Sequence, residues 1–505
     1  MFPCSLVISF IIIICLTFLW LRWRTNKLNL FKNYGIPGPK PDFFTGNFKE
    51  FQLERTKCVE KWLKKYGKIF GFFLGTKPYI MCSDTEFLKI MQIKEFKRFS
   101  TRDRILPDIG IPHESVKHVI GLQKGIKWRN MRSVLTACFS SQKIKMMSVS
   151  TQDLIVDSMK KIEKENGKPF DALQSYKNLV FNIMMKLVMG VKFNEESEEY
   201  NKIVKSLNFF LQKDISSTSS VISMYFPEFE PIPSYFRLVF DIIKSILNFN
   251  SIRFLFNTCK SIIAVRKQLM NNQQDILQSL LNAEISYTDH DKKLTSSSVL
   301  ISAVLMITSG YETISYSLGW CTYFLAKNQE IQEKARQEIN KNIEKDKDIH
   351  YADVMKLHYL DQIISESLRL SSLSVLLISR AGEQDFEYKG MTIPKHVGIF
   401  VPVPILHRDP NYWQEPDKFD PDRFSPENRI NINPMTYQPF GAGPRNCVAY
   451  RMARTVMKLV MANLIRSFVF DACECGRSEM KHSIFSTRET DSILIKATSI
   501  SSNQI

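Results

Sequence analysis

Apolar positions are unevenly distributed along the chain, and the first 21 residues stand out. Residues 1–21 carry no charged side chain, and the stretch LVISFIIIICLTFLWL is almost entirely apolar. A membrane-spanning helix needs about 20 such residues. Arg22, Arg24 and Lys27 follow the run rather than precede it, and no small-residue cleavage site is evident, so a retained signal anchor is favoured over a cleaved secretory signal. The basic residues predict that everything after Arg22 faces the cytosol.

A proline-rich stretch separates this anchor from the rest of the chain. YGIPGPKPDFFTG has prolines at 37, 39 and 41, which cannot continue a helix and favour an extended spacer. No Gly/Ser linker or internal repeat follows. We therefore predict an anchor over 1–21, a basic and Pro-rich hinge over 22–41, and one catalytic domain over 42–505.

Helical periodicity dominates the body of the chain. It covers residues 115–166, 171–189, 195–210, 294–342 and 351–370. The sequence TSSS offers an N-cap at the start of the fourth of these segments. Alternating patterns at 68–84, at 385–403 and after 466 predict short strands. The expected fold class is mainly α with small β-sheets and a single-pass N-terminal anchor.

Two further apolar stretches allow more than one interpretation. Between residues 299 and 326 the only charge is Glu312, as in a second membrane span, but the polar centre TSGYETISYS favours a helix that crosses the protein core. Residues 222–256 are rich in Phe and contain three prolines. They fit either a core-packed helix pair or a surface that dips into the membrane.

Charge and cysteine content narrow the class of protein. The net charge is +17, which suits an anionic membrane surface or an acidic partner, and nucleic acid is not expected because no nucleic-acid motif accompanies the charge. The ten cysteines are scattered and include no C-x-x-C pair, as expected of free thiols in a reducing compartment. The eight histidines are dispersed too, so a zinc site is not supported.

The most distinctive chemistry lies in FGAGPRNC, residues 440–447. A cysteine thiolate is a soft, strong ligand for iron, and burial and hydrogen bonds to its sulfur tune such a centre. Gly441 and Gly443 allow the backbone to turn toward the sulfur, and a helix beginning near Val448 favours the thiolate. Arg445 can reach a negatively charged cofactor rim. A lone buried Cys behind a turn would not explain the ordered set F-x-x-G-x-R-x-C.

This loop resembles the haem-binding loop of the cytochrome P-450 superfamily, F-x-x-G-x-R-x-C-x-G, with Ala449 in place of the last Gly. The resemblance extends from about residue 35 to the end and is closest to the animal microsomal branch that oxidises drugs and steroids. It implies haem b (iron protoporphyrin IX) as cofactor, Cys447 as the axial ligand of the iron, and Phe440, Gly443 and Arg445 as cofactor-binding residues.

Other family motifs follow in the expected order. Glu366 and Arg369 form E-x-x-R, and because i and i+3 share a helix face they can form a charge-assisted hydrogen bond. By resemblance, Arg423 in FDPDRF completes a buried structural knot with this pair. FDPDRF carries Asp422 where the family usually has Glu. Ser371 and Ser372 stand where relatives often have Pro.

Four basic or aromatic positions are candidates for the haem propionates. Trp128 and Arg132 are four residues apart on a predicted helix, so they can hold one propionate together. The resemblance also suggests Arg380 as a second propionate partner, with Arg102 as a weaker candidate.

The segment SGYET, residues 309–313, resembles the family's A-G-x-E-T. There the long helix passes over the open face of the haem. The resemblance implies that Gly310 leaves room for dioxygen and that the Thr313 hydroxyl bonds back to a helix carbonyl and relays a proton. Glu312 would then replenish that proton, so Thr313 and Glu312 are the expected catalytic residues.

The resemblance implies a haem-thiolate monooxygenase that inserts one oxygen atom from O2 into a lipophilic steroid, lipid or xenobiotic. The chain contains no G-x-G-x-x-G segment, so a separate reductase must supply the electrons. The resemblance points to the membrane-bound NADPH-dependent flavoprotein reductase, with a small b-type cytochrome as a further partner. The expected location is the endoplasmic reticulum membrane, with the catalytic domain in the cytosol. Basic residues near the loop are candidates to meet an acidic reductase surface: Lys124, Lys127, Arg129, Arg451, Arg454 and Lys458.

Two alternatives stay open at this point. Some family members rearrange peroxides or dehydrate without dioxygen or electrons, although these tend to lose the acid–alcohol pair that Glu312 and Thr313 preserve here. A non-enzymatic haem carrier or sensor is the second alternative. Substrate specificity is expected in residues 100–122, 205–256 and 373–378.

Overall fold

The computed structural model describes residues 2–53, 55–103, 117–211, 218–229, 252–269, 275–286, 294–345, 347–372, 378–473 and 492–500, together with residues 232, 235, 236, 239 and 273. The chain forms two compact units. Unit 1 comprises Met1–Ile109, Asp214–Ile243 and Val375–Pro402. Unit 2 comprises Gly110–Lys213, Lys244–Ser374 and Val403–Ile505.

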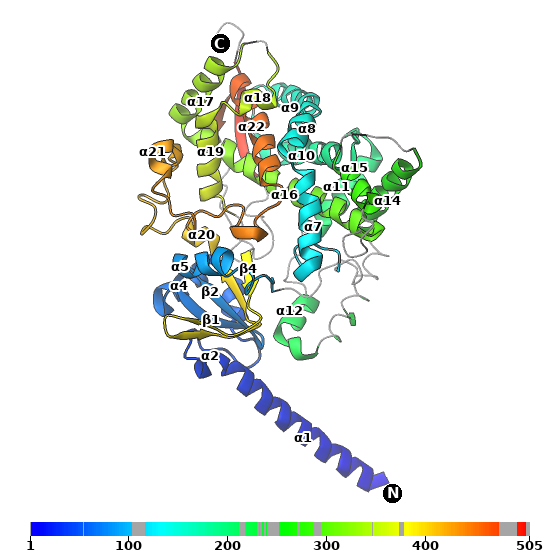
Figure 1. Cartoon of the computed structure of the whole chain (residues 1–505), viewed down its shortest axis with the longest axis vertical. Helices are drawn as coiled ribbons and strands as arrows, with labels where there is room; N and C mark the ends of the chain where they lie inside the picture. Colours follow the sequence, from blue (N-terminus) through cyan, green and yellow to red (C-terminus); the bar gives the residue numbers. More distant parts are fainter. Residues whose placement is uncertain are drawn as a thin grey trace. The chain divides into compact units, whose positions relative to one another are not determined.

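Unit 1 is built around a four-stranded sheet with the order β1-β2-β7-β4 (Figure 1). The β1–β2 and β4–β7 pairs are antiparallel, whereas β2 and β7 run parallel. Every residue of β1, IFGFFL, is buried, as suits a strand of aromatic and β-branched side chains. The strands are β1 (Ile69–Leu74), β2 (Lys77–Cys82), β4 (Ile378–Ala381) and β7 (Gly398–Val401), with a separate hairpin of β5 (Phe386–Tyr388) and β6 (Met391–Ile393).

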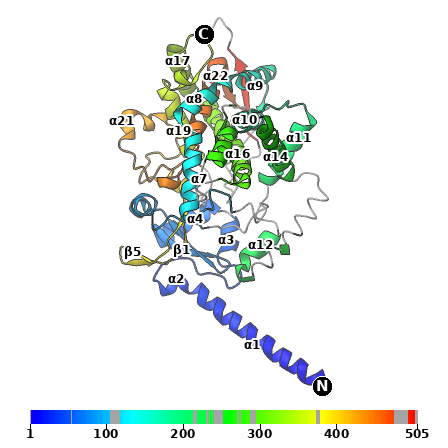
Figure 2. The ribbon, with the colours of Figure 1, turned by 45° about the vertical axis from the view of Figure 1, so that its right-hand side comes forward.

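The described helices of unit 1 come from the first two of its three segments. They are α1 (Phe2–Leu28), α2 (Leu30–Asn33), α3 (Phe48–Leu53), α4 (Arg55–Tyr66), α5 (Thr85–Lys89), η1 (Ile90–Lys94), α12 (Thr218–Tyr225) and η2 (Pro227–Phe229). Although α12 is distant in sequence, it lies beside α3 (Figure 2), and the Tyr225 and Phe48 rings are 5.6 Å apart.

The apolar helix α1 extends beyond the predicted anchor of 1–21 and ends at Leu28. Its stretch Leu6–Leu28 is long and apolar enough to cross a membrane, and no residue of its most apolar window is buried in the protein. Arg24 near its end is an exception, because its side chain is completely buried.

Arg24 is the centre of a cluster that we call the Arg24 hub: Trp20, Arg24, Phe43, Phe44, Thr76, Tyr225, Phe226 and Glu228. The guanidinium of Arg24 pairs with Glu228 and donates to the carbonyl oxygens of Phe43 at 2.6 Å and Tyr225 at 2.8 Å. Aromatic rings of the hub surround the cation, which lies 5.1 Å from the Phe226 ring centroid. One of the basic residues that predicted the anchor's orientation therefore lies inside the protein.

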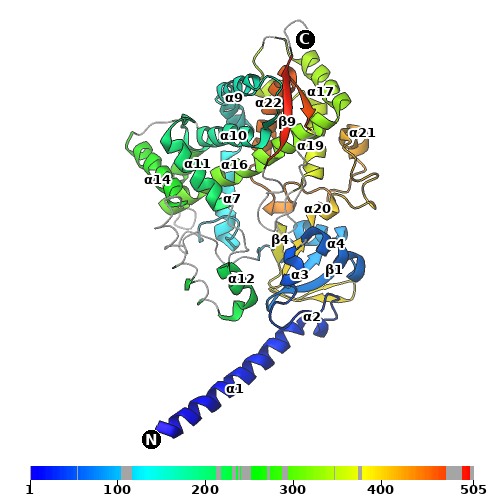
Figure 3. The same ribbon diagram turned by 180° about the vertical axis from the view of Figure 1, so that it is seen from behind.

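Unit 2 is mainly helical. Its helices are α7 (Gly125–Cys138), α8 (Ser141–Val149), α9 (Gln152–Lys164), α10 (Ala172–Met189), α11 (Glu198–Leu211), α14 (Ile252–Leu269), α15 (Ile276–Ser286), α16 (Ser296–Lys327), α17 (Gln329–Asn342), α18 (Tyr351–Val354), α19 (His358–Leu370), α20 (Val403–Leu406), η3 (Pro421–Phe424), α21 (Pro426–Arg429), η4 (Gly443–Arg445) and α22 (Tyr450–Ser467). A small sheet with the order β3-β9-β8 completes it: β3 (Phe170–Asp171), β8 (Phe468–Ala472) and β9 (Leu494–Ser499). Figure 3 shows β9 beside α22.

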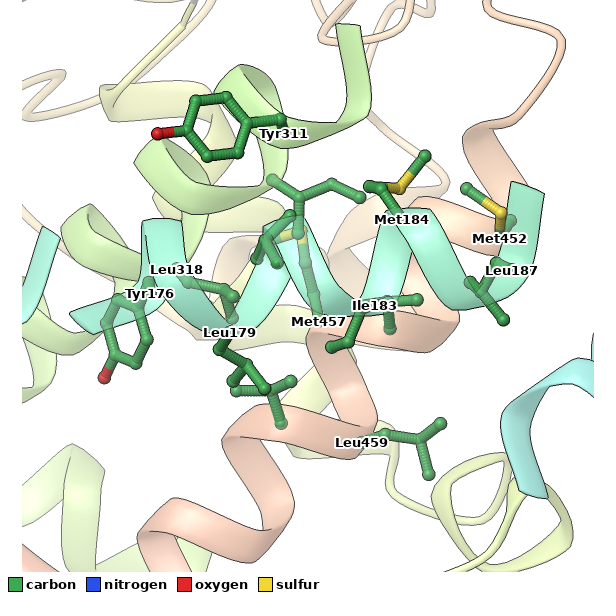
Figure 4. Close-up of a cluster of buried hydrophobic side chains, with 14 of the residues drawn as sticks. Tyr176, Leu179, Ile183, Met184, Leu187, Tyr311, Leu318, Met452, Met457 and Leu459 are labelled. Carbon is green, nitrogen blue, oxygen red and sulfur yellow. The ribbon is translucent and has the colours of Figure 1, made fainter. Parts of the chain in front are cut away.

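The core of unit 2 lies where α10, α16 and α22 meet. Figure 4 shows Leu179 and Met184 of α10, Leu318 of α16, and Met452 and Met457 of α22 in this cluster. Because 61% of the most apolar window of α16 is buried inside the protein, this helix is a core helix rather than an exposed span. The prediction for residues 299–326 agrees with that position.

The fold class, mainly α with small β-sheets, is as predicted, but several boundaries differ. Residues 294–342 form two helices that break at Asn328, and 351–370 form α18 and α19. The region 385–403 supplies three strands rather than a pair, because β7 joins the large sheet of unit 1. The predicted N-cap is present, since the Thr295 hydroxyl accepts from the Ser298 N–H at 3.1 Å.

Two other sequence expectations meet the structure only in part. About half of 222–256 lies outside the described residues. Among the rest, Phe229, Ile232, Tyr235, Phe236 and Val239 are exposed, whereas Met224 and Leu255 are buried. Cys473 is disulfide-bonded, which departs from the expectation of free thiols throughout.

Candidate functional site

The loop that carries Cys447 is closed by its own backbone. The Cys447 N–H donates to the Phe440 carbonyl at 2.8 Å, and Gly441 and Gly443 adopt φ of 73° and 70°, which favours glycine. Helix α22 begins at Tyr450, two residues later than predicted, with Ala449 as an N-cap that makes no side-chain hydrogen bond. The Cys447 thiol is exposed at this helix start.

Exposure distinguishes Cys447 from the other free cysteines that the structure describes in unit 2. Cys138, Cys259 and Cys321 are buried. Burial raises the pKa of the Cys138 thiol to about 11 and that of Cys321 to about 12. These three side chains are therefore neutral thiols at physiological pH and poor metal ligands.

Helix α7 and the chain just before it contact the cysteine loop through two arginine side chains, one from the loop and one from the helix. The Arg445 guanidinium is buried and lies 4.4 Å from the Trp128 ring centroid, and it donates to the Gln123 carbonyl at 2.7 Å. Arg132 donates to the main-chain and side-chain oxygens of Asn446, at 2.5 and 2.6 Å. The structure thus brings Trp128, Arg132 and Arg445 together around the loop.

Burial also acts on the pKa of Arg132. It lowers the pKa of the guanidinium, and the nearby Cys447 sulfur acts in the opposite direction. The two groups are therefore close enough to interact electrostatically. An anionic sulfur at Cys447 would lie next to a fixed cation.

Thr313 and Glu312 lie in the middle of α16. The Thr313 hydroxyl donates to the Ser309 carbonyl at 2.8 Å, the back-bond expected from the sequence. Glu312 is buried. One face of this largely buried helix remains half-buried or exposed, at positions three or four residues apart, as expected of one helix face: Leu305, Met306, Ser309, Gly310, Thr313 and Ser317.

The structure gives a packing reason for Gly310. A Cβ at this position would lie 2.5 Å from Cε and 2.6 Å from Sδ of Met184 on α10. The absence of a side chain therefore allows α10 and α16 to approach closely. This is a different reason from the space for dioxygen that the family resemblance suggested.

Glu366, Arg369 and Arg423 meet in a buried cluster, which we call the Glu366 knot. Glu366 and Arg369 are completely buried and form two hydrogen bonds, at 2.7 and 2.8 Å. Arg423 lies 3.3 Å from the same carboxylate. Arg369 also donates to the main-chain oxygens of His407 and Pro416, both at 2.7 Å, so its charge is well satisfied.

His407 was not among the residues predicted from the sequence. Its ring is completely buried, and its two nitrogens lie 3.1 Å from the Arg369 carbonyl and 2.9 Å from the Gln438 backbone nitrogen. A lone His after an apolar run is a weak signal, and these partners are 38 and 31 residues away in the chain.

Two of the predicted propionate partners belong to unit 1. Arg380 lies in unit 1, buried on β4, and donates to the Ser379 carbonyl at 2.7 Å. Arg102 also belongs to unit 1. Of the three segments expected to set specificity, large parts lie outside the described residues: 104–116, 212–217, 240–251 and 373–377.

The predicted basic face is smaller than the sequence suggested. Lys458 is buried, where it donates to the Val354 carbonyl at 3.0 Å, and Arg454 pairs with Asp361 at 2.7 Å. The exposed basic residues near the loop are Lys124, Lys127, Arg129 and Arg451.

Comparison with known proteins settles the family. The sequence model of the family described as Cytochrome P450 matches residues 36–495. The chain belongs to the cytochrome P450 family. Similar curated P450s are cytochrome P450 3A14 of Cavia porcellus, 31% identical over 461 residues (90% of this chain and 89% of the relative), and cytochrome P450 3A25 of Mus musculus, 31% identical over 471 residues (92% and 91%). Cytochrome P450 3A30 of Fundulus heteroclitus is 30% identical over 476 residues (93% and 92%).

This P450 is a monooxygenase that depends on haem b, and its residues fit that cofactor. An exposed thiol stands at the start of an 18-residue helix, two arginines lie against its loop, and α16 keeps one open face. A soft anionic sulfur is the donor that haem iron needs in this class, and the cations suit the anionic rim of a porphyrin. The acid–alcohol pair Glu312–Thr313 is also present.

Proposed function

We propose that this P450 inserts one oxygen atom from O2 into a lipophilic small molecule, with Cys447 as the axial ligand of the haem iron. The observation that carries the assignment is the exposure of the Cys447 thiol, while the other described free cysteines of unit 2 are buried and neutral. When bound, haem supplies the activation of dioxygen and the oxygen transfer.

The residues around Cys447 hold its sulfur in a fixed place. The Phe440–Cys447 hydrogen bond closes the loop, and Arg132 fixes Asn446, the residue before the ligand. The start of α22 and the nearby Arg132 both favour the anionic sulfur. Arg445 is held against Trp128 and, with Arg132, provides positive charge for the propionates. Arg380 of unit 1 is proposed as a further propionate partner.

Two adjacent residues on α16 are proposed to deliver protons on the substrate side. Thr313 Oγ1 holds a hydrogen that it donates to the Ser309 carbonyl, and rotation of the hydroxyl would release it. Glu312 is a buried acid one residue away and can return a proton to Thr313 Oγ1 through water, since adjacent residues on a helix do not face each other. The proposed substrate is a steroid, lipid or xenobiotic, as is consistent with the similarity to 3A enzymes.

The redox partner and the membrane location are also proposals. No dinucleotide-binding G-x-G-x-x-G motif occurs in the sequence, so an NADPH-dependent flavoprotein reductase is proposed as electron donor, docking near the exposed basic residues around α7 and the start of α22. α1 would anchor the protein in the endoplasmic reticulum membrane, with the rest in the cytosol. The exposed Phe229, Tyr235 and Phe236 are proposed to contact the same membrane.

Replacing the proposed ligand tests the assignment. The reduced CO complex of Cys447→Ala should lose the thiolate-type Soret band, because the iron loses its sulfur ligand. Cys15→Ala removes another exposed free thiol, on α1, and should keep the band. A thiolate-type spectrum that survives in Cys447→Ala would refute the assignment. Product formation without added reductant would favour a rearrangement rather than an oxygen insertion.

A further inference from the structure

His407 connects the Glu366 knot to the segment that leads into the cysteine loop. It follows α20, and its completely buried ring stacks on Tyr437, with centroids 5.3 Å apart and planes inclined by 27°. On one side His407 forms two hydrogen bonds with Arg369. Arg369 Nη1 donates to the His407 carbonyl at 2.7 Å, and the His407 Nδ1 lies 3.1 Å from the Arg369 carbonyl.

The hydrogen-bond partners fix the protonation of the ring. The Gln438 backbone N–H can only donate, so the His407 Nε2, at 2.9 Å, must accept. Nδ1 then carries the hydrogen and donates to the Arg369 carbonyl. Burial, together with the cations of Arg369 and Arg408, lowers the pKa of His407 to about 3, so the ring is neutral at physiological pH.

Gln438 lies at the start of the cysteine loop and is held by hydrogen bonds at both its N–H and its carbonyl. Its carbonyl accepts from the Gly441 N–H at 3.0 Å, and the Phe440 carbonyl accepts from the Cys447 N–H at 2.8 Å. The bond from Gln438 to His407 therefore sets where this pair of turns begins. Between Gln438 and Cys447 two glycines have positive φ, so the loop backbone depends on such attachments for a single geometry.

We propose that His407 is a positioning residue for the thiolate: its Nε2 holds Gln438 and so transmits the fixed geometry of the Glu366 knot to the Cys447 loop. The inference rests on the proposed role of Cys447 as iron ligand. Outer-shell groups of this kind orient a ligand without touching the metal, and their loss usually costs metal affinity or activity.

Two conservative variants distinguish the proposed positioning of Gln438 from a general contribution of His407 to the stability of the fold. In His407→Gln the side-chain oxygen can take the place of Nε2 and accept from Gln438. In His407→Asn the amide nitrogen can take the place of Nδ1 and donate to Arg369, but nothing reaches Gln438. Both remove one buried hydrogen bond, so we expect similar losses of thermal stability.

The two variants should differ at the iron. For the reduced CO complex of the full-length holoprotein, His407→Gln should keep most of the thiolate-type band, and His407→Asn should lose at least about half of it. Equal bands in the two variants, or a larger loss in His407→Gln, would overturn the proposal. Activity is not needed for this readout.

Hydrogen exchange in the wild-type holoprotein keeps the test open if either variant fails to fold. The Gln438 amide should exchange at least about tenfold more slowly than an unprotected amide. Unprotected exchange at Gln438 would refute the proposal. Because this measurement follows a backbone amide, its outcome does not depend on whether Cys447 is the ligand.

Discussion

At the scale of single residues, buried charges show what sequence reasoning can and cannot reach. The i, i+3 spacing of Glu366 and Arg369 was sufficient to predict their contact, since helix geometry places them on one face. The sequence could not supply the other partners of Arg369, because the carbonyls of His407 and Pro416 come from irregular chain 38 and 47 residues away. These distant acceptors allow the charge to be buried at all.

The Glu366 knot leads to a stability prediction. Glu366→Gln should lower the free energy of unfolding by about 3–5 kcal/mol, because it leaves Arg369 buried without its counter-ion. Chemical denaturation of the holoprotein measures the loss. Asp422→Asn is a matched control: its exposed pair with Lys334 should contribute at most about 1 kcal/mol. Similar losses in the two variants would show that Arg369 finds another anion or solvent.

At the scale of elements, the sequence predicted most helices but not where the long segments break. The pattern of residues 294–342 continues past Asn328, where the side chain instead caps the end of α16 by donating to the Phe324 carbonyl at 2.7 Å. The end of α10 was predicted correctly at Met189, and the next residue, Gly190, has φ of 71° as a C-cap. The neighbours of this glycine were unpredictable, because they come from α14 and the chain before α15.

Gly190 should therefore be more sensitive than an ordinary cap glycine. A Cβ there would collide with the side chains of Asp275, which forms a buried ion pair with Arg266, and of Gln273, which accepts a hydrogen bond from Arg266. Gly190→Ala should lower the free energy of unfolding by about 2–4 kcal/mol, from backbone strain plus the displaced pair. Gly390→Ala has a similar φ of 76° but open space around it, so it should lose only about 1 kcal/mol. Equal losses of unfolding free energy in the two variants, measured by thermal or denaturant unfolding, would show that displacing the ion pair contributes nothing.

At the scale of the whole molecule, a net charge of +17 does not say which cations are available to a partner. Six basic residues near the loop looked equivalent in the sequence, yet Arg454 and Lys458 are bound to Asp361, at 2.7 and 3.4 Å. The sequence alone could not distinguish these two residues from the four exposed ones, since Asp361 is almost one hundred residues upstream. The family motifs, by contrast, identified the chemistry of the molecule because each motif is short and local.

The remaining exposed cations lead to a prediction about the proposed docking of a reductase. Neutralising Lys127 and Arg129 together, as Lys127→Gln/Arg129→Gln, should raise the apparent KM for reductase several-fold at low salt and flatten its salt dependence. The CO spectrum should not change. Lys64→Gln/Lys65→Gln on α4 removes the same charge from another exposed site and should leave reductase-driven turnover unchanged. Unaltered turnover and salt dependence in the first variant would exclude this docking face.

The Arg24 hub has a practical consequence for shortening the protein. A truncation made just before Trp23 would remove most of the apolar helix but keep Arg24 paired with Glu228. A truncation only a few residues later, before Leu28, would remove the cation and leave Glu228 as a largely buried carboxylate with Thr76 as a neutral partner. An isolated buried charge is costly. The truncation before Trp23 should therefore give a stably folded protein, whereas the truncation before Leu28 should destabilise it.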